Sequence, residues 1–342
     1  MNPHSSLMAT EAATAHEFAG QLICRFDAEF EPVLASLSLS NLSMVVTCAR
    51  GSSDHAALFL KFLLETQCGL LTSSLSPSVC SVYGMHPEIS DGICIAISQS
   101  GCSTDILSVV RSYSSRGTPT VAIVNDVTSP LATVADFVIP MLAGSERSVA
   151  ATKTFIATLT ACLLLLEKIR PSAINSSEVA NLPNLLKAAV RLDWSSLVEG
   201  LANAQSIFVL GRGPTLAIAE KAALKLKEVC GIHAEALSSA EVHHGPMALM
   251  IKNFPILIFR PNDAGATGVD DFAKFAVELG CRVYVAGRSI PGAMELPTVA
   301  AHPLIEPILQ IQAFYLAVDA LATRRGLDPD APPNLKKVTV TV

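Results

Sequence analysis

The sequence has few charged residues for its length and no run of like charge. Asp, Glu, Lys and Arg make up 16% of its 342 residues, half of the residues are hydrophobic, and the formal net charge is −6. This composition excludes a disordered chain and indicates extensive burial, with room for a subunit interface. Because no Lys/Arg-rich segment is present, we expect no nucleic-acid partner.

Membrane spans, secretory signals and paired cysteines are missing as well. The longest apolar run, residues 155–166, is too short to cross a bilayer, so we expect a buried helix and no membrane partner. The N-terminus shows no basic segment followed by an apolar one, so we expect no secretory signal. None of the nine cysteines forms a CxxC pair and most lie in apolar runs, as expected of reduced thiols in a cytoplasmic protein.

What the sequence does contain is a rhythm of short β-rich runs separated by helical patterns. After a helical segment, residues 1–40, such runs occur at 43–49, 92–98, 119–125 and 135–141. Similar runs return at an offset of about 162, at 206–215, 254–261 and 281–289. Apolar strands that alternate with helices predict a parallel sheet covered on both faces. The expected fold class is α/β, with two tandem doubly wound parallel-sheet subdomains of flavodoxin-like or Rossmann-like type.

The rhythm also predicts how the chain is divided. Helical patterns are expected at 151–170 and 307–326. The predicted segments are an N-terminal helical segment (1–40), a first subdomain (41–170), a linker and helix (171–200), a second subdomain (201–325) and a C-terminal tail (326–342).

The stretch "ISQSGCSTD" gathers short polar side chains directly after an apolar strand. Its candidate ligands for an anion are Ser98, Gln99, Ser100 and Ser103, just before a predicted helix start near Thr104. Helix N-termini offer free N–H groups and a positive dipole end, and hydroxyls add donors without charge. The alternative is an N-cap with polar neighbours, because Ser, Thr and Asp all cap helices. So many hydroxyls favour a site for a terminal phosphate monoester.

A second strand-to-helix turn, "CARGSSDHAA", follows the first strand of the same half. Ser52 and Ser53 could meet the same phosphate, because neighbouring strand ends can face one crevice in a doubly wound sheet. Taken alone, this turn is better explained by helix capping through Ser52 or Ser53. The chain has no GxxxxGK[ST] loop and no GxGxxG after a strand, so a nucleotide loop is not expected.

The segment "KAALKLKEVCGIHAEALSSAEVHHGP" concentrates ionisable residues. Lys221, Lys225 and Glu228 share one helix face, which could line a cleft or could be a solvated stripe with a weak salt bridge. His244 and its neighbours are metal-ligand types without HExxH or CxxC spacing, so we expect no metal. An acid/base set that includes Glu228 and His244 is the better interpretation.

These motifs resemble a known family. "ISQSG.S.D", "ERSVAATKTF", "ALKLKEVCGIHAEA", "E..HHGPMAL" and "NLKKVTV" together resemble the sugar isomerase (SIS) fold over nearly the whole chain, and in particular the isomerase half of glutamine–fructose-6-phosphate amidotransferase. The free-standing pattern "GSSDHA" with "SVAATKTF" is similar to type II glucosamine-6-phosphate deaminases. Ala151 departs from the serine usual in the family motif "VASTK".

The resemblance implies a role for each candidate residue. It places Ser53, Ser98, Gln99, Ser100 and Ser103 on the sugar phosphate, and Val149 and Thr152 facing the sugar. It makes Glu228 the residue that moves the proton between C1 and C2, with Lys225 beside it. It gives ring opening to His244, supplied by the neighbouring subunit of a homodimer. It lets Lys337 form a Schiff base with the open-chain ketose.

The expected function is that of a glucosamine-6-phosphate deaminase that yields fructose 6-phosphate and ammonia, with a small-molecule sugar phosphate as partner and no cofactor. The first cysteine, Cys24, lies in a helical pattern, so we expect no glutaminase activity. The alternatives are another phosphosugar isomerase of this fold, a fructosamine-phosphate deglycase, or a sugar-phosphate sensor without turnover. The presence of Lys225, Glu228, His244 and Lys337 favours an enzyme.

Overall fold

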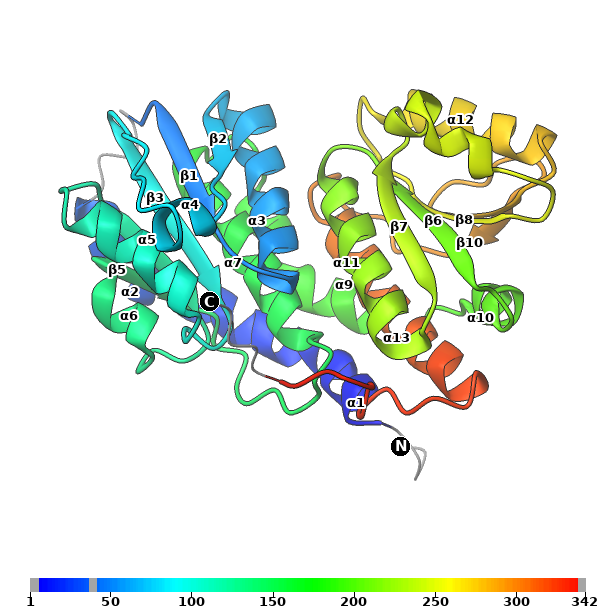
Figure 1. The fold of residues 1–342 in the computed structure, drawn as a ribbon, viewed down its shortest axis with the longest axis horizontal. Helices are drawn as coiled ribbons and strands as arrows, with labels where there is room; N and C mark the ends of the chain where they lie inside the picture. The colour runs from blue at the N-terminus through cyan, green and yellow to red at the C-terminus, as the bar shows by residue number, and fades with distance from the viewer. Residues whose placement is uncertain (1–5, 37–41, 338–342) are drawn as a thin grey trace. The chain divides into compact units, whose positions relative to one another are not determined.

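The computed structural model describes residues 6–36 and 42–337, which divide into two compact units. The first-sheet unit comprises Glu17–Glu146, Lys153–Ala180 and Lys336–Val342. The second-sheet unit comprises Met1–His16, Arg147–Thr152 and Asn181–Leu335. Each contains one five-stranded parallel sheet (Figure 1). The predicted α/β class with two parallel-sheet subdomains is therefore confirmed.

The first-sheet unit has the strand order β2-β1-β3-β4-β5. Its strands are β1 (Met44–Cys48), β2 (Leu71–Ser74), β3 (Gly92–Ser98), β4 (Thr120–Val124) and β5 (Phe137–Pro140). Its helices are α2 (Ala15–Ser36, entering the unit at Glu17), α3 (Ser52–Leu63, continued by a π-helix at Leu64–Cys68), α4 (Ser78–Ser81), α5 (Thr104–Ser114), α6 (Pro130–Val134), α7 (Lys153–Ile169) and α8 (Ser176–Ala180).

Helices cover both faces of this sheet, as strands buried on both sides require. Alternate strand residues such as Val46, Cys94 and Ala122 form one apolar cluster with α4, α5 and α6. Helices α3 and α7 pack together on the other side (Figure 1). Every residue of α7 from Lys153 to Leu166 is buried, which confirms the predicted buried helix. Within the described ranges no helix has the length and apolarity that a membrane span needs.

The second-sheet unit has the strand order β10-β9-β8-β6-β7. Its strands are β6 (Ser206–Gly211), β7 (His233–Ser238), β8 (Pro255–Phe259), β9 (Arg282–Ala286) and β10 (Met294–Leu296). Its helices are α1 (Leu7–Ala13), α9 (Leu182–Ala189), α10 (Ser195–Leu201), α11 (Pro214–Cys230), α12 (Ala266–Glu278) and α13 (Glu306–Arg324), with short 3-10 helices at Glu241–His244 and Pro246–Leu249.

This sheet is also covered on both faces. Helix α12 packs Phe272 and Ala276 against Phe208, Ile256 and Val283 of the strands. On the other face, the Phe259 ring of β8 meets the Phe314 ring of α13 with the ring centres 5.9 Å apart. The predicted helix at 307–326 is thus observed as α13, a central element of the core.

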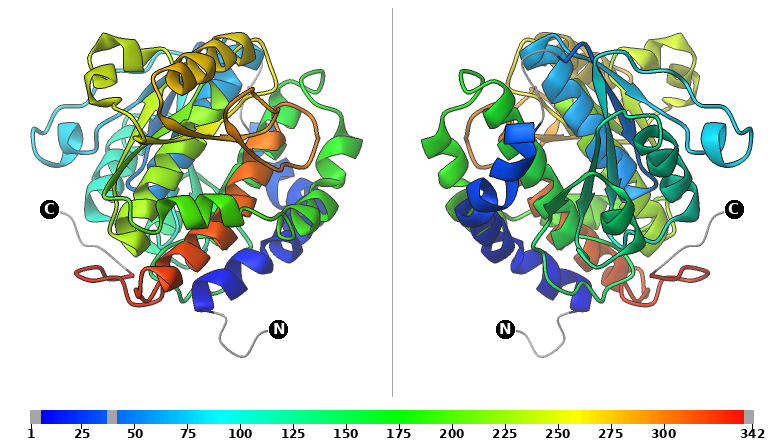
Figure 2. Two further views of the ribbon diagram at one scale, coloured as in Figure 1. Left: turned by 90° about the vertical axis from the view of Figure 1, so that its right-hand side faces the viewer. Right: turned by 90° about the vertical axis from the view of Figure 1, so that its left-hand side faces the viewer.

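Two sets of hydrogen bonds hold helix ends of the second-sheet unit in place. Helix α1 lies beside α13 (Figure 2), and the Asp330 carboxylate accepts hydrogen bonds from the first backbone N–H groups of α1, those of Leu7 (2.6 Å) and Met8 (2.9 Å). Arg325 donates to the backbone oxygens of Cys230, Leu201, Ala202 and Ala204 at 2.8–3.3 Å. One guanidinium thereby satisfies carbonyls at the ends of α10 and α11, which helices otherwise leave unpaired.

Candidate functional site

The two predicted hydroxyl-rich loops lie together at the carboxyl ends of two neighbouring strands of the first sheet, β1 and β3. From β1 the chain crosses to β2 on one side, and β3 lies on the other side, so the carboxyl ends of β1 and β3 flank a topological switch point. Open α/β sheets bind their ligands at such points. The parallel pairing of β1 and β3, with Cys48 opposite Ala96, places loops 49–53 and 98–103 on the same edge.

Helix capping does not account for these side chains. The N-cap of α3 is Gly51, and Ser103, the N-cap of α5, makes no side-chain capping bond. Within the described ranges the side chains of Ser53 and Gln99 form no hydrogen bond either. The side chains of Ser53, Gln99 and Ser103 therefore make no capping hydrogen bond among the described residues, and their polar groups remain available to a ligand.

Ser98 and Ser100 shape the loop and keep a hydrogen to donate. The Ser98 hydroxyl oxygen accepts the N–H of Gly101 at 3.1 Å, and that of Ser100 accepts the N–H of Cys102 at 3.4 Å. Gly101 has φ 62°, and a Cβ at this position would stand 2.1 Å from the Ser129 hydroxyl oxygen. Only glycine fits there, so the loop holds its hydroxyls in a fixed turn.

Sequence reasoning missed an ion pair that joins the two loops. Arg50, in the turn after β1, places Nε and Nη2 each 2.8 Å from Oδ2 of Asp105, in the first turn of α5. The Asp105 side chain is only 2% exposed and also accepts the N–H of Ile106 at 2.9 Å. The available signal was a pair of opposite charges in two otherwise hydroxyl-rich turns.

Lys225 and Glu228 form an ion pair on α11. Glu228 accepts a hydrogen bond from the ammonium of Lys225, whose side chain is fully buried, while that of Glu228 is 20% exposed. Lys221, one turn earlier, is also fully buried. A solvated charged stripe is thus excluded for these lysines, since ammonium groups are buried only where they are paired or bonded.

Glu228 also stands in the wall of a pocket of about 460 Å³ within the second-sheet unit. One wall is the face of α11 and the other is the segment after α13. The lining residues are Leu224, Lys227, Glu228, Val229, Gly231, Gly326, Leu327, Asp328, Ala331, Pro333 and Leu335. The carboxylate therefore combines a buried cation on one side with access to a cavity on the other.

The two neighbouring histidines, His243 and His244, have different surroundings. His243 packs its ring edge-on against Phe272, with the ring centres 5.6 Å apart, which is a packing contact. His244, at the end of the 3-10 helix Glu241–His244, is exposed and forms no hydrogen bond with any residue that the structure describes. Residues 6–36 and 42–337 contain no group of three or more His, Cys, Asp or Glu side chains placed to hold a metal ion.

The loop that carries Val149 and Thr152 is held by a carboxylate that sequence reasoning missed. Glu11 of α1, itself buried, accepts the N–H of Arg147 at 2.7 Å and of Ser148 at 3.1 Å. Val149 is half-buried and Thr152 is fully buried.

In the first-sheet unit, the Lys337 ammonium lies 2.9 Å from the Glu146 carboxylate.

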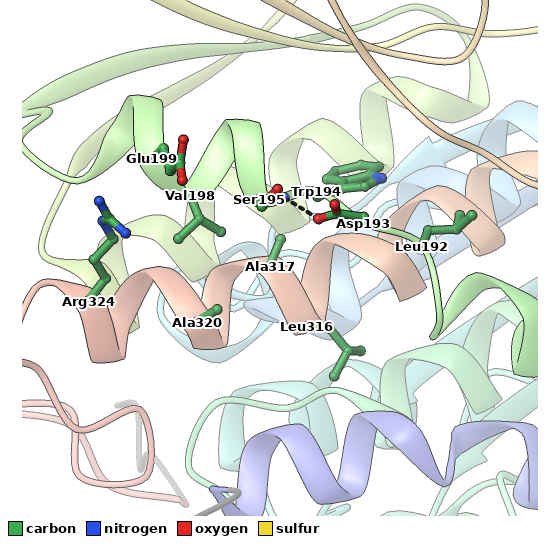
Figure 3. A pocket seen from close by; sticks show the side chains of 10 residues that line it. All are labelled: Leu192, Asp193, Trp194, Ser195, Val198, Glu199, Leu316, Ala317, Ala320 and Arg324. Atoms are coloured by element: carbon green, nitrogen blue, oxygen red, sulfur yellow. Dashed lines mark hydrogen bonds between the residues drawn. The ribbon is translucent and has the colours of Figure 1, made fainter. Parts of the chain in front are cut away.

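A smaller pocket, of about 260 Å³, lies between α10 and α13 (Figure 3). Its walls are mostly apolar, with Glu199 and Arg324 toward one end and the Asp193–Ser195 contact toward the other. None of the predicted site residues lines it.

The structure thus shows an α/β protein with two hydroxyl-bearing loops at a switch point of its first sheet. In its second-sheet unit, the Lys225–Glu228 ion pair lies beside a pocket. The family model of the SIS domain matches residues 38–168 and 200–280. The chain therefore belongs to the SIS domain family.

Individual relatives agree with that assignment. The crystal structure of a proposed phosphosugar isomerase from Silicibacter pomeroyi is 38% identical, with a TM-score of 0.91 over 95% of this chain and 100% of that one. The C-terminal domain of glucosamine-fructose-6-phosphate aminotransferase from Francisella tularensis is 26% identical, with a TM-score of 0.87 over 97% and 99% of the two chains. The isomerizing glutamine–fructose-6-phosphate aminotransferase of Sulfolobus acidocaldarius is 34% identical over 91% of this chain and 52% of its own length. The chain thus spans about half the length of the curated relatives it matches.

Proposed function

We propose that the protein is a glucosamine-6-phosphate deaminase, which isomerises the amino sugar and releases ammonia to give fructose 6-phosphate. The observation that carries the proposal is the Glu228 carboxylate, paired with the buried Lys225 ammonium and standing at a pocket wall. A carboxylate fixed beside a buried cation and open to a cavity is suited to move a proton at a carbon atom.

The proposed binding set follows from the loops. The hydroxyls of Ser53, Ser98, Ser100 and Ser103 and the amide of Gln99 would donate to the phosphate at the switch point, where the positive dipole ends of α3 and α5 favour an anion. Val149 and Thr152 would contact the sugar. Ser52, next to Ser53 in the turn after β1, would bind the same phosphate. No metal or organic cofactor takes part in the proposed chemistry.

The proposed reaction balances with water as the second reactant. The sugar ring opens with His244 as acid/base, and Glu228 removes the proton at C2 of the open-chain aldehyde. The enolamine that results takes a proton at C1, which leaves an imine at C2. Water adds to the imine carbon and ammonia departs, so that C2 becomes the ketone of fructose 6-phosphate.

The direction of the reaction is part of the proposal. The relative from Sulfolobus acidocaldarius is named an isomerizing glutamine–fructose-6-phosphate aminotransferase. The chemistry of releasing ammonia needs only water in addition to the residues described above. A different isomerase of this family would interconvert a ketose and an aldose phosphate without ammonia, a deglycase would release an amine from a fructosamine phosphate, and a sensor would bind without turnover.

One assay panel separates these outcomes. Purified protein is incubated with glucosamine 6-phosphate, galactosamine 6-phosphate, a fructosamine 6-phosphate and tagatose 6-phosphate, and both ammonia and ketose phosphate are measured. We expect ammonia and fructose 6-phosphate in equal amounts from glucosamine 6-phosphate. If only the fructosamine phosphate releases an amine, the protein is a deglycase. If a sugar phosphate is isomerised without ammonia, it is another isomerase of this family. If a sugar phosphate binds and no product forms, it is a sensor.

We also propose a homodimer in which His244 completes the neighbour's site, because this imidazole is exposed and unbonded within its own described chain. The inactive variants Glu228→Gln and His244→Asn are unfolded together and reassembled. If the site is shared, a mixed dimer has one site with both lesions and one intact site. Random pairing makes about half of the dimers mixed, so activity should return to about a quarter of the parent's. Mixed dimers that stay inactive would show that each chain supplies both residues itself.

A further inference from the structure

A fully buried carboxylate lies against the lysine at the end of the described chain. The Glu146 side chain, with no exposed surface, accepts a hydrogen bond from Nζ of Lys337 at 2.9 Å. The Lys337 side chain is 26% exposed. The ammonium is therefore held at a buried anion while its side chain still reaches the surface of its unit.

The Glu146 carboxylate does not depend on Lys337 alone. It also accepts the hydroxyl of Thr154 at 2.7 Å and the N–H of Thr154 at 3.1 Å. Thr154 is the second residue of α7, a 17-residue helix whose first N–H groups and dipole favour a negative charge. If Lys337 moves away, the carboxylate keeps these partners and does not become a bare buried charge, which would be strongly unfavourable.

A second lysine nearby in sequence is engaged elsewhere. Lys153 donates to the backbone oxygen of Ser145 at 2.6 Å, and its ammonium lies 4.6 Å from the centre of the Phe18 ring. The fold brings Lys337 to Glu146 although the two residues are 191 positions apart in the chain.

We propose that Glu146 is the positioning residue for Lys337. It holds the ammonium in the resting protein and takes one of its protons when Lys337 attacks C2 of the open-chain ketose as a free amine. This inference rests on the proposed function and on the Schiff base with the open-chain ketose that the family resemblance implies for Lys337.

The step conserves atoms and charge. A proton passes from Nζ to the Glu146 carboxylate, and the nitrogen lone pair then forms a bond to C2 while the carbonyl opens. The oxygen of C2 leaves as water after it takes one proton from Nζ and one from Glu146. The products are a protonated C2=N bond to Lys337, one water molecule and the Glu146 carboxylate in its starting form.

The test is to trap the Schiff base. The full chain is incubated with fructose 6-phosphate and sodium borohydride, which reduces the iminium to a stable amine, and labelling of Lys337 is followed by peptide mass spectrometry. Glu146→Gln keeps the shape and removes the charge, so we expect labelling at least tenfold slower, with fructose 6-phosphate still protecting against thermal unfolding. Thr154→Val, which disturbs the same cluster but keeps the carboxylate, should label within about threefold of the parent rate.

A double-variant comparison separates positioning from simple structural support. Lys337→Arg keeps a cation for Glu146 but forms no Schiff base. If Glu146 acts through Lys337, ammonia release by the double variant Glu146→Gln/Lys337→Arg is no slower than by Lys337→Arg alone. Losses that multiply, or an unchanged labelling rate in Glu146→Gln, overturn the proposal. If Glu146→Gln does not fold, Glu146→Asp replaces it, because the shorter side chain withdraws the charge; labelling at the parent rate then overturns the proposal.

The same measurements keep this inference apart from the proposed function. A parent protein that releases ammonia without labelling at Lys337 refutes the role of Glu146 and leaves the deaminase intact. A parent protein labelled at Lys337 that releases no ammonia refutes the deaminase, and slower labelling of Glu146→Gln then still supports the positioning role. A parent protein that shows neither overturns both.

Discussion

Arg50 and Asp105 link the two turns that follow β1 and β3, through two guanidinium nitrogens that each lie 2.8 Å from one carboxylate oxygen. The two residues are 55 positions apart in the chain, and one is almost fully buried while the other is 45% exposed. The pair therefore acts as a cross-link at the switch point, between the two loops whose hydroxyls would hold a phosphate.

Replacing this arginine by lysine should loosen both loops. A lysine ammonium cannot reproduce the paired contacts of a guanidinium fork, so Arg50→Lys should raise the KM for the phosphorylated sugar several-fold and lower the free energy of unfolding by roughly 1–2 kcal/mol. Arg111→Lys, an exposed change on α5, is the matched control and should alter neither quantity. Steady-state kinetics and urea unfolding would measure both, and an Arg50→Lys protein equal to the control would remove the cross-link from the account.

Ser103 allows a test of binding without a stability effect. Its hydroxyl makes no capping bond in the structure, so Ser103→Ala should leave the free energy of unfolding within about 0.5 kcal/mol of the parent. If that hydroxyl donates to the phosphate, the KM should rise roughly tenfold, because a hydrogen bond to a charged group contributes about 1.5 kcal/mol or more. Ser108→Ala on the same helix serves as control, since this hydroxyl donates to the Thr104 backbone oxygen. A KM equal to the control's would place the phosphate elsewhere.

Arg325 should be important for stability, and its neighbour Arg324 should not. Arg325 donates to four backbone oxygens at the ends of α10 and α11, whereas Arg324 is exposed and makes no hydrogen bond within the described ranges. Arg325→Met should lower the free energy of unfolding by roughly 2–4 kcal/mol, because it leaves carbonyls unpaired. Arg324→Met should change it by less than about 0.5 kcal/mol. Chemical unfolding of both variants decides the matter, and equal stabilities would contradict this anchoring role.

Asp319 should make stability depend on pH. Burial raises the pKa of Asp319; the hydrogen bond donated by Ser6 opposes the shift, and Asp330 and Asp328 add to it. The folded protein thus binds this proton at a higher pH than the unfolded chain does. The free energy of unfolding falls as the pH rises from the ordinary pKa of aspartate, about 3.9, to the raised pKa of Asp319. This loss of stability persists at pH 7.

The amide of Asp319→Asn can still accept the Ser6 hydroxyl but carries no charge. The variant should therefore gain stability over the parent at pH 7, and the gain should disappear below about pH 4. Unfolding free energies of both proteins at the two pH values measure this. A difference between variant and parent that does not change with pH would refute the assignment of the cost to the ionised carboxylate.

Pattern reasoning found the central strands and missed most of the edge strands. The runs at 43–49, 92–98 and 254–261 are almost wholly apolar because β1, β3 and β8 are buried on both faces. Strands β2, β7 and β10 lie at sheet edges, where polar residues such as Ser73 and Glu235 face solvent, so their periodicity is weak. The edge strand β5 was found because Phe137–Pro140 is apolar despite its position.

The candidate site could be predicted where a motif is local in sequence. The hydroxyl loops and the Lys225–Glu228 spacing are read directly from neighbouring residues. Three observed contacts join residues far apart in the chain: Arg50 with Asp105 (55 positions), Glu11 with Arg147 (136 positions) and Glu146 with Lys337 (191 positions). No periodicity connects such residues. Their partners follow only from the folded topology.

The central claim is that Glu228 removes the C2 proton in the reaction that releases ammonia. The most direct measurement uses glucosamine 6-phosphate deuterated at C2 and follows the deuterium at C2 of the remaining sugar together with ammonia. For the parent and for the exposed control Glu278→Gln, we predict loss of deuterium from C2 in step with ammonia release. For Glu228→Gln, which keeps the shape and removes the base, we predict that deuterium stays at C2 and that ammonia release falls by at least about a hundredfold. Loss of deuterium from C2 at the parent rate in Glu228→Gln would contradict the account.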